Sequence, residues 1–294
     1  MSDKTRGELA LIAVTLVWGA SFVLVKNTLD HISTWLFLAA RFTVAALCLL
    51  AFFGRRALAP HQARPLALSA GAWAGLCLAA AYCFQTFGLR HTTPSKSAFI
   101  TGLSSVLVPF LAFLVYKKAP HPSEAMGVAV ATVGLGLLTI PAGTLAIGYG
   151  EAISLCCTVA FAAHILVLGR YSPLVPFELL SVTQLGVTAM VCGLMAGFAE
   201  APSAASSARV WGAILFTGIL CTAIPFTVQA WAQRHTTATR AALIFTFEPV
   251  SAAITSYLLL GETLTGRAVV GALLILGGVL AVELKPAGSA KHPC

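Results

Sequence analysis

Long apolar runs separated by short polar segments dominate this sequence. Each run is close to the roughly 20 residues that an α-helix needs to cross the hydrocarbon core of a membrane. Ten such runs fill the 294 residues and leave no room for a separate soluble domain. The pattern therefore predicts an all-α membrane protein with ten transmembrane helices, which begin near Leu9, Thr34, Leu66, Ser95, Ala125, Gly150, Val175, Val210, Thr239 and Arg267.

An internal repeat divides the chain into halves. The segment Arg-His-Thr-Thr at 90–93 recurs at 234–237, an offset of 144 residues that also relates Gln85 to Gln229. Continuing that offset pairs Lys96 with Arg240, Gly127 with Gly271 and Gly134 with Gly278, and an offset of 143 pairs Gly7-Glu8 with Gly150-Glu151 and Trp18 with Phe161. We therefore predict two five-helix units, residues 1–147 and 148–294.

The number of helices in each unit sets the orientation of the second copy. Because five is odd, the second unit enters the membrane from the opposite side. This is an inverted-topology repeat, the architecture that many secondary transporters use for alternating access around a site near the midplane. The sequence thus favours a transporter.

Composition and charge agree with the membrane assignment. Hydrophobic residues make up 58% of the chain and charged residues 10%, against roughly 45–50% and 25% in soluble domains. The net charge of +8 could suggest nucleic acid as a partner, but the positions of the charges argue against it. With the N-terminus inside, the inner segments carry twelve Lys and Arg and the outer connections four, which predicts cytoplasmic termini.

Several motifs resemble a known family, and the resemblance covers essentially the whole chain. The first helix carries Trp18-Gly19-Ala20-Ser21-Phe22, and the second half carries Glu248-Pro249, Leu-Gly-Glu-Thr-Leu-Thr at 260–265, Gly271 and Gly277-Gly278. In this order and spacing they resemble the EamA branch of the drug/metabolite transporter superfamily. The first half departs from the pattern, since Ser104-Ser105 and Lys117-Lys118 replace the Glu-Pro and Gly-Glu elements.

The resemblance implies ten helices and export of small metabolites, including amino acids and drug-like cations, without nucleotide hydrolysis. Overall similarity is greatest to bacterial aromatic amino acid exporters, which implies a location in the bacterial inner membrane.

Ionisable residues within the predicted spans are candidates for chemistry, because they are costly in a membrane and should face the interior or an interface. Arg41 requires backbone carbonyls, a lipid phosphate or a substrate carboxylate as its partner. His164 fits either a hydrogen-bonded core position or proton transfer. Glu248 could bind a substrate ammonium or a proton, or could cap or lock helices. Lys26 can reach the headgroups with its long stem or contact substrate.

Polar and aromatic residues complete the candidate site. Gln85 and Gln229 lie near helix ends and, with Arg41, are candidates for gate or structural roles. Aromatic side chains could line a cavity for an apolar substrate or face lipid. The substrate-cavity candidates are Trp18, Tyr82, Phe99, His164, Trp231, Phe245, Glu248 and Tyr257.

Prolines and missing motifs bear on mechanism. Pro109, Pro225 and Pro249 should interrupt their helices, as hinges or as static kinks. The sequence contains no phosphate-binding loop, zinc-protease motif or nucleophile elbow, so we expect no enzyme activity, cofactor or metal. Seven of the eight cysteines lie in apolar runs, which argues against a disulfide framework.

We therefore predict a secondary transporter that exports small zwitterionic metabolites, in particular hydrophobic or aromatic amino acids. The alternative is an efflux carrier for cationic drugs, with Glu248 as the counter-charge. A lipid-processing enzyme or assembly subunit is disfavoured, because an enzyme needs clustered acids or nucleophiles at one depth. One His and one Glu within the spans are compatible with proton exchange or with facilitated diffusion.

Overall fold

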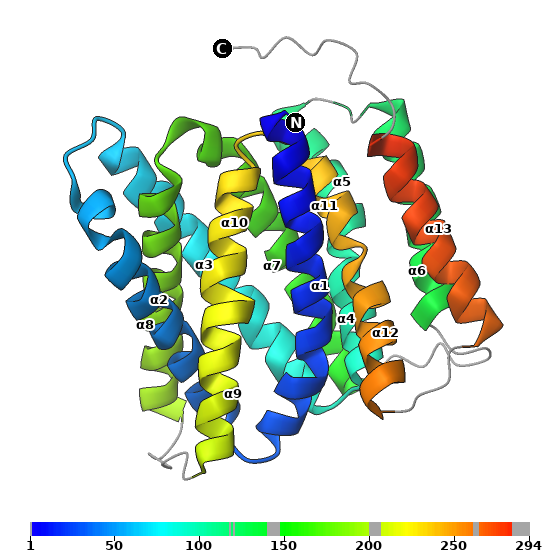
Figure 1. Ribbon diagram of the computed structural model, residues 1–294, viewed down its shortest axis with the longest axis horizontal. Coiled ribbons are helices and arrows are strands. Elements are labelled where there is room, and N and C mark those ends of the chain that lie inside the picture. Colours follow the sequence, from blue (N-terminus) through cyan, green and yellow to red (C-terminus); the bar gives the residue numbers. More distant parts are fainter. Residues whose placement is uncertain are drawn as a thin grey trace.

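Helices account for every regular element in the part of the chain that the computed structural model describes, residues 2–117, 119, 121–139, 148–199, 207–260 and 265–283. Figure 1 shows them arranged as a bundle. Lys118, motif residues 261–264 and the predicted unit boundary at 147 lie outside the described residues.

The helices follow the predicted apolar runs. In the first half these are α1 (Asp3–Leu29), α2 (Thr34–Leu58), α3 (Arg64–Arg90), α4 (Pro94–Gly102), α5 (Ser104–Tyr116) and α6 (Pro122–Thr139). In the second half they are α7 (Tyr149–Tyr171), η1 (Ser172–Leu174), α8 (Phe177–Ala199), α9 (Ala208–Gly218), η2 (Ile219–Ala223), α10 (Ile224–Ala232), α11 (Ala238–Phe245), α12 (Glu248–Leu260) and α13 (Gly266–Glu283).

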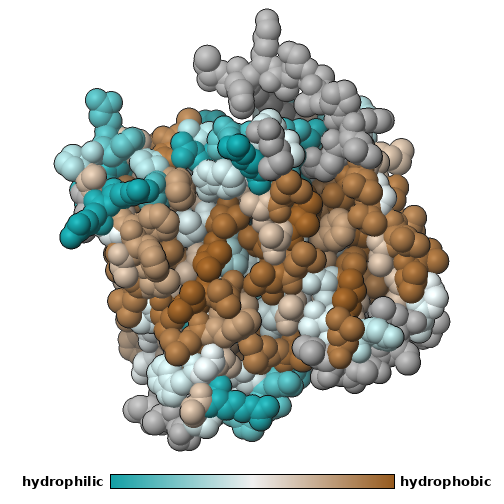
Figure 2. Space-filling view, viewed as in Figure 1, coloured by the Kyte–Doolittle hydropathy of each residue, from teal (hydrophilic) through white to brown (hydrophobic). Residues whose placement is uncertain are grey.

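Seven stretches of the described residues are long and apolar enough to cross a membrane: 3–29, 34–57, 64–90, 96–116, 149–174, 177–198 and 208–232. Helices α6 and α13 contribute shorter apolar segments, 122–138 and 266–282. Figure 2 shows a broad hydrophobic face between hydrophilic ends. The prediction of an all-helical, membrane-type protein is confirmed, whereas the count of ten spans and their inverted arrangement remain predictions.

Side-chain caps begin equivalent helices in the two halves. The hydroxyl of Thr93 accepts the backbone N–H of Lys96 at the start of α4, and the hydroxyl of Thr237 accepts that of Arg240 at the start of α11. Each hydroxyl satisfies a backbone donor that has no partner within its helix. The last residue of each repeated Arg-His-Thr-Thr segment is therefore a helix N-cap.

The helix that follows each cap is broken at equivalent positions. Leu103 separates α4 from α5, and Thr246 and Phe247 separate α11 from α12. Pro109 lies within α5, so the first break does not occur at the proline that we predicted to cause it. Pro225 and Pro249 do lie beside irregular segments, after η2 and at the start of α12.

Glycines bring α6 and α13 into backbone contact. A Cβ atom on Gly127 would lie 2.9 Å from the carbonyl oxygen of Gly278, and one on Gly271 would lie 2.5 Å from that of Gly134. Small residues permit such close packing of helices in a membrane, where water does not drive apolar surfaces together. These glycines are those that the 144-residue offset relates, Gly127 to Gly271 and Gly134 to Gly278.

We predict that Gly271→Ala lowers the thermal unfolding temperature by several degrees in detergent, because the added methyl group meets the backbone of α6. The matched control is Gly277→Ala on the same helix, where a Cβ meets nothing within 4 Å. This control should be neutral or stabilising by up to about 1 kcal/mol, since alanine favours the helix. Equal effects of the two substitutions would contradict the close contact.

Candidate functional site

A central cavity lies between helices of both halves. The space open to water-sized spheres is about 50 Å³, enough for a few waters. The cavity is therefore narrow in this conformation. The wall is formed by Trp18, Ser21, Phe22, Val25, Arg41, Tyr82, Gln85, Thr86, Leu89, Thr101, Ser104, Phe161, His164, Ile165, Phe226, Gln229, Phe245 and Glu248.

The wall includes most of the residues predicted from sequence. Trp18, Tyr82, His164, Phe245 and Glu248 belong to it. The three gate candidates, Arg41, Gln85 and Gln229, line the same cavity, so the structure does not separate them from the substrate-cavity set.

Three aromatic candidates lie elsewhere. Among the described residues the cavity wall does not include Phe99, Trp231 or Tyr257. Phe99 is half-buried, Trp231 packs against His235 with ring centroids 5.6 Å apart, and Tyr257 is 51% exposed. Helical position alone does not determine which face of a helix meets the cavity.

The irregular segment η2 accepts hydrogen bonds from two residues of the cavity wall, Trp18 and Arg41. Pro225 has no N–H to donate to the carbonyl four residues earlier, that of Cys221. This carbonyl instead accepts hydrogen bonds from Trp18 Nε1 at 3.0 Å and Arg41 Nη2 at 3.3 Å. Thr222 Oγ1 accepts a further bond from Arg41 Nε at 2.7 Å. Such π-type insertions are frequent at functional sites.

Arg41 is buried without a carboxylate partner. Its guanidinium lies 4.8 Å from the centre of the Tyr82 ring, and Nη2 is 3.4 Å from the Tyr82 hydroxyl. Among the described residues no group accepts a hydrogen bond from Nη1 and no acid pairs with the charge. The partners of Arg41 are therefore neutral, and one face of the cation remains available in the cavity wall.

Glu248 places an ionisable acid in the wall, at the break between α11 and α12. Glu248 is 7% exposed, and its side chain makes no hydrogen bond or ion pair with any described residue. Gly19 allows the close approach of α1 here, since a Cβ on Gly19 would lie 2.5 Å from Ser251 Cβ. An unpaired carboxylate and an unpaired guanidinium thus occur in one cavity.

His164 and the neighbouring aromatic rings complete the wall. His164 Nε2 hydrogen-bonds Gln184 Oε1 at 2.9 Å, which gives one nitrogen of the buried imidazole a partner. The centroid of the Phe226 ring lies 5.6 Å from that of His164 and 5.2 Å from that of Trp18. The centroid of the Phe245 ring lies 5.4 Å from that of Trp18. Half of the wall residues are therefore aromatic or aliphatic, and the other half are polar.

Repeat-related residues form most of the wall. The offsets of 143 and 144 relate its members in pairs: Trp18 with Phe161, Ser21 with His164, Phe22 with Ile165, Tyr82 with Phe226, Gln85 with Gln229, Thr101 with Phe245, and Ser104 with Glu248. Sequence reasoning did not place Phe226, Thr101 or Ser104 among the cavity candidates. The offset would have found them, because each is the counterpart of a residue that it did select.

Three of the four remaining wall residues show toward which end the cavity extends. Val25, Thr86 and Leu89 lie near the ends of α1 and α3, and their repeat counterparts are not in the wall. The cavity therefore extends toward the end of the bundle opposite the start of α1, which we call the distal end. The end where α1 starts is the proximal end.

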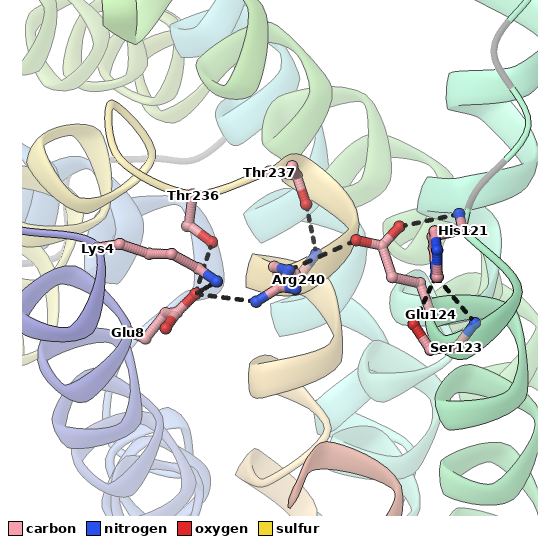
Figure 3. Close-up of polar contacts among 8 residues, drawn as sticks. All are labelled: Lys4, Glu8, His121, Ser123, Glu124, Thr236, Thr237 and Arg240. Atoms are coloured by element: carbon pink, nitrogen blue, oxygen red, sulfur yellow. Dashed lines mark hydrogen bonds and ion pairs between the residues drawn. The ribbon is translucent and has the colours of Figure 1, made fainter. Parts of the chain in front are cut away.

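A largely buried ion cluster lies at the proximal end, and Figure 3 shows its contacts. Arg240, with 9% of its side chain exposed, lies between Glu8 (Nη1 to Oε1, 3.5 Å) and Glu124 (Nε to Oε1, 3.5 Å). Thr236 donates to Glu8 at 3.2 Å, and Lys4 lies 3.6 Å from it. This proximal cluster joins α1, α6 and α11.

The distal end carries the repeat counterpart of this cluster with fewer charges. Lys96 lies 3.0 Å from Glu151, which also accepts a hydrogen bond from Thr92 at 2.7 Å. This distal cluster contains a single acid, and 41% of the Lys96 side chain is exposed. The proximal cluster therefore contains more charges than the distal cluster, and its Arg240 side chain is more buried than that of Lys96.

Residues that often bind metals are not clustered in the described part of the chain. They contain no group of three or more His, Cys, Asp or Glu side chains that could hold a metal ion. Their seven cysteines are free thiols.

Comparisons with known proteins agree with the transporter interpretation. The model of the EamA-like transporter family matches the chain twice, at residues 5–140 and 148–284. An uncharacterized transporter of Archaeoglobus fulgidus is 31% identical over 95% of this chain and 86% of its own length. A probable terminal-alkyne amino-acid exporter of Streptantibioticus cattleyicolor is 24% identical over 95% and 94% of the two chains.

A solved crystal structure shares the fold, with a TM-score of 0.79 at 19% identity, over 95% of this chain and 98% of the other. The family consists of transporters rather than enzymes, so the protein is a multi-pass membrane protein whose partner is a small molecule. The two family matches together cover almost the whole sequence, and the chain therefore belongs to the EamA-like transporter family.

Proposed function

We propose that this protein exports small zwitterionic metabolites, in particular hydrophobic or aromatic amino acids, from the cytoplasm. The observation that carries the proposal is the presence of Arg41 and Glu248, both buried and without charged partners, in the wall of one cavity. A similar chain that is named a probable amino-acid exporter supports the substrate class.

The two charges match the two ends of an amino acid. Burying an unpaired ion costs several kcal/mol, and a ligand that brings the opposite charge removes much of that cost. Arg41 offers Nη1 to a carboxylate, and Glu248 offers its carboxylate to an ammonium group. Gln229 adds an acceptor, because its Oε1 is buried without a hydrogen-bond partner in the described structure.

The aromatic wall matches an apolar side chain. The Trp18 ring is tilted relative to the rings of Phe226 and Phe245, with centroids 5.2 Å and 5.4 Å away. Tilted and edge-on contacts of this kind favour a further aromatic ring. Since the cavity holds only a few waters, the wall must open to admit such a group.

Ten spans in two inverted units, residues 1–147 and 148–294, would supply that opening through alternating access. The reciprocal glycine contacts support this architecture. Under the repeat, the contact of Gly127 with Gly278 corresponds to that of Gly271 with Gly134, as a two-fold axis requires. The positions of the Lys and Arg residues favour cytoplasmic termini. The resemblance to bacterial exporters favours the bacterial inner membrane, where lipid is the surrounding partner.

In this mechanism the proximal and distal clusters act as gates, each of which must separate for the protein to open at its end. The cavity extends toward the distal end while the proximal cluster is intact, which corresponds to an outward-facing or occluded state if the termini are cytoplasmic. To open inward, the protein must separate Arg240 from Glu8 or Glu124. His164 and Gln85, which we also predicted for the pathway, then line the cavity wall.

Efflux of cationic drugs is the second candidate, because Glu248 is an unpaired acid in the cavity wall. Arg41 in the same wall repels a substrate that lacks an anionic group, so we rank this function lower. Growth protection against cationic drugs that Glu248→Gln abolishes would favour it.

We predict that proteoliposomes transport labelled Phe, Trp, Met, Thr or Leu, with preference for the aromatic members. For Phe, Arg41→Gln and Glu248→Gln should each lower kcat/KM at least tenfold, because a hydrogen bond to a charged group contributes about 1.5–3 kcal/mol. Arg41→Gln should improve relative transport of phenethylamine, which lacks the carboxylate, and Glu248→Gln that of 3-phenylpropionate, which lacks the ammonium.

The matched control for these variants is Tyr257→Phe, which alters an exposed residue outside the cavity wall and should leave transport unchanged. Failure of the protein to release any of the five amino acids under any gradient would overturn the amino acid proposal. Equal transport of Phe and its two singly charged analogues by the wild type would refute the two-charge site.

The clusters generate a second prediction. Arg240→Gln should lower the free energy of unfolding by about 3 kcal/mol, because it leaves two largely buried acids without their shared counter-charge. Lys96→Gln, at the repeat-equivalent position, should cost less than about 1 kcal/mol, since that lysine is partly solvated. Thermal and denaturant unfolding in detergent measure the difference.

Hydrogen exchange separates a gate from a purely structural cluster. Arg240→Gln should raise exchange at the starts of α1 and α11 while α3 and α8 stay protected. A uniform rise across all helices would instead indicate general destabilisation and would count against the gate.

A further inference from the structure

Arg90 and Arg234 occupy equivalent places in the two halves but differ in their contacts. Arg90 donates from Nε to the Thr34 hydroxyl at 2.7 Å and from Nη2 to the carbonyl of Leu29 at 2.9 Å. These bonds attach the end of α3 to the turn between α1 and α2. The repeat predicts the same role for Arg234 at the turn between α7 and α8.

Arg234 cannot form the equivalent bond, because the second copy lacks the hydroxyl. The residue 143 positions after Thr34 is Phe177, and each begins its helix, α2 and α8. The Arg234 guanidinium lies over the Phe177 ring, 6.0 Å from its centre. It forms no hydrogen bond or ion pair with any described residue. All five of its N–H donors are therefore available.

These donors border a cleft at the proximal end of the bundle. The cleft lies where α2 ends and α8 begins, and about 430 Å³ of it is open to water-sized spheres. Arg56, His61 and Glu178 also line it. Arg56 is 3.9 Å from Glu178 with 73% of its side chain exposed, so this pair is weak.

The cleft carries an excess of donors over acceptors. Two guanidinium groups face one carboxylate, and Glu178 neutralises only part of their charge. His61 Nδ1 accepts the backbone N–H of Ala63 at 3.0 Å. This leaves Nε2 as the protonated nitrogen of the neutral ring and a further donor.

We propose that this cleft binds a phosphate group, and that in the membrane the group is the headgroup of an anionic phospholipid. Forked guanidinium donors match phosphate oxygens in geometry and charge. Exposed apolar residues adjoin the cleft, Phe52 one turn before Arg56 and Leu174 in its wall, at 79% and 51% exposure. They provide a surface for acyl chains beside the headgroup site. The proposal does not depend on the identity of the transported substrate.

Native mass spectrometry of the full chain in detergent tests the proposal with three probes: short-chain phosphatidylglycerol, short-chain phosphatidylcholine and inorganic phosphate. We expect phosphatidylglycerol to bind more tightly than phosphatidylcholine. Arg56→Gln and Arg234→Gln should each weaken its binding about threefold to fivefold. Arg6→Gln, which removes a charge at the same end but outside the cleft, should leave the dissociation constant unchanged.

A substitution that should tighten binding tests whether loss of the fold explains the weaker binding of the other variants. Glu178→Gln removes the one acid of the cleft and should tighten phosphatidylglycerol binding about threefold. Binding that is insensitive to Arg234→Gln, or weakened by Glu178→Gln, would overturn the proposal. Inorganic phosphate that binds with the same variant dependence while the lipid does not would overturn the lipid source and retain the phosphate site.

Discussion

The carbonyl of Cys221 is the point on which the candidate site depends. A helix in a membrane must satisfy its backbone groups internally, and Pro225 removes the donor that this carbonyl would otherwise receive. The indole of Trp18 and the guanidinium of Arg41 supply the missing hydrogen bonds from α1 and α2. One backbone defect therefore fixes an aromatic ring and a cation in the cavity wall.

Equivalent contacts in the two halves position the helices around the site. Differences between equivalent residues supply its ionisable groups. Backbone contacts through glycine place α6 against α13, and similar breaks open α4–α5 and α11–α12 beside the cavity. Within this frame Ser104 of one half corresponds to Glu248 of the other. Arg41 likewise corresponds to Gln184, which bonds His164. One half thus contributes a buried guanidinium and the other a buried carboxyl group, neither of which has a charged partner.

The same divergence distinguishes the two ends of the bundle. Arg240 and Lys96 are equivalent in sequence, but only Arg240 meets a second acid, because α6 brings Glu124 beside it. Similarly, replacement of Thr34 by Phe177 in the second copy leaves Arg234 without the bonds that Arg90 makes. Small changes on a duplicated backbone therefore enlarge the ion cluster at one end and leave a basic cleft at the same end.

The sequence by itself determined the helical membrane class, the repeat offset and most of the polar wall. The length of an apolar run indicates a membrane helix, because a backbone without internal hydrogen bonds is costly in lipid. An unpaired polar residue within such a helix must face the interior. The tertiary structure alone decided which aromatic rings meet the cavity, since Trp231 and Tyr257 lie on helices that also carry wall residues yet point elsewhere. It also decided that Gln85 and Gln229 share the cavity with Glu248, and that a helix breaks at Leu103 rather than at Pro109. These outcomes depend on helix rotation and on contacts between residues far apart in the chain, such as Trp18 and Cys221, which a local pattern does not encode.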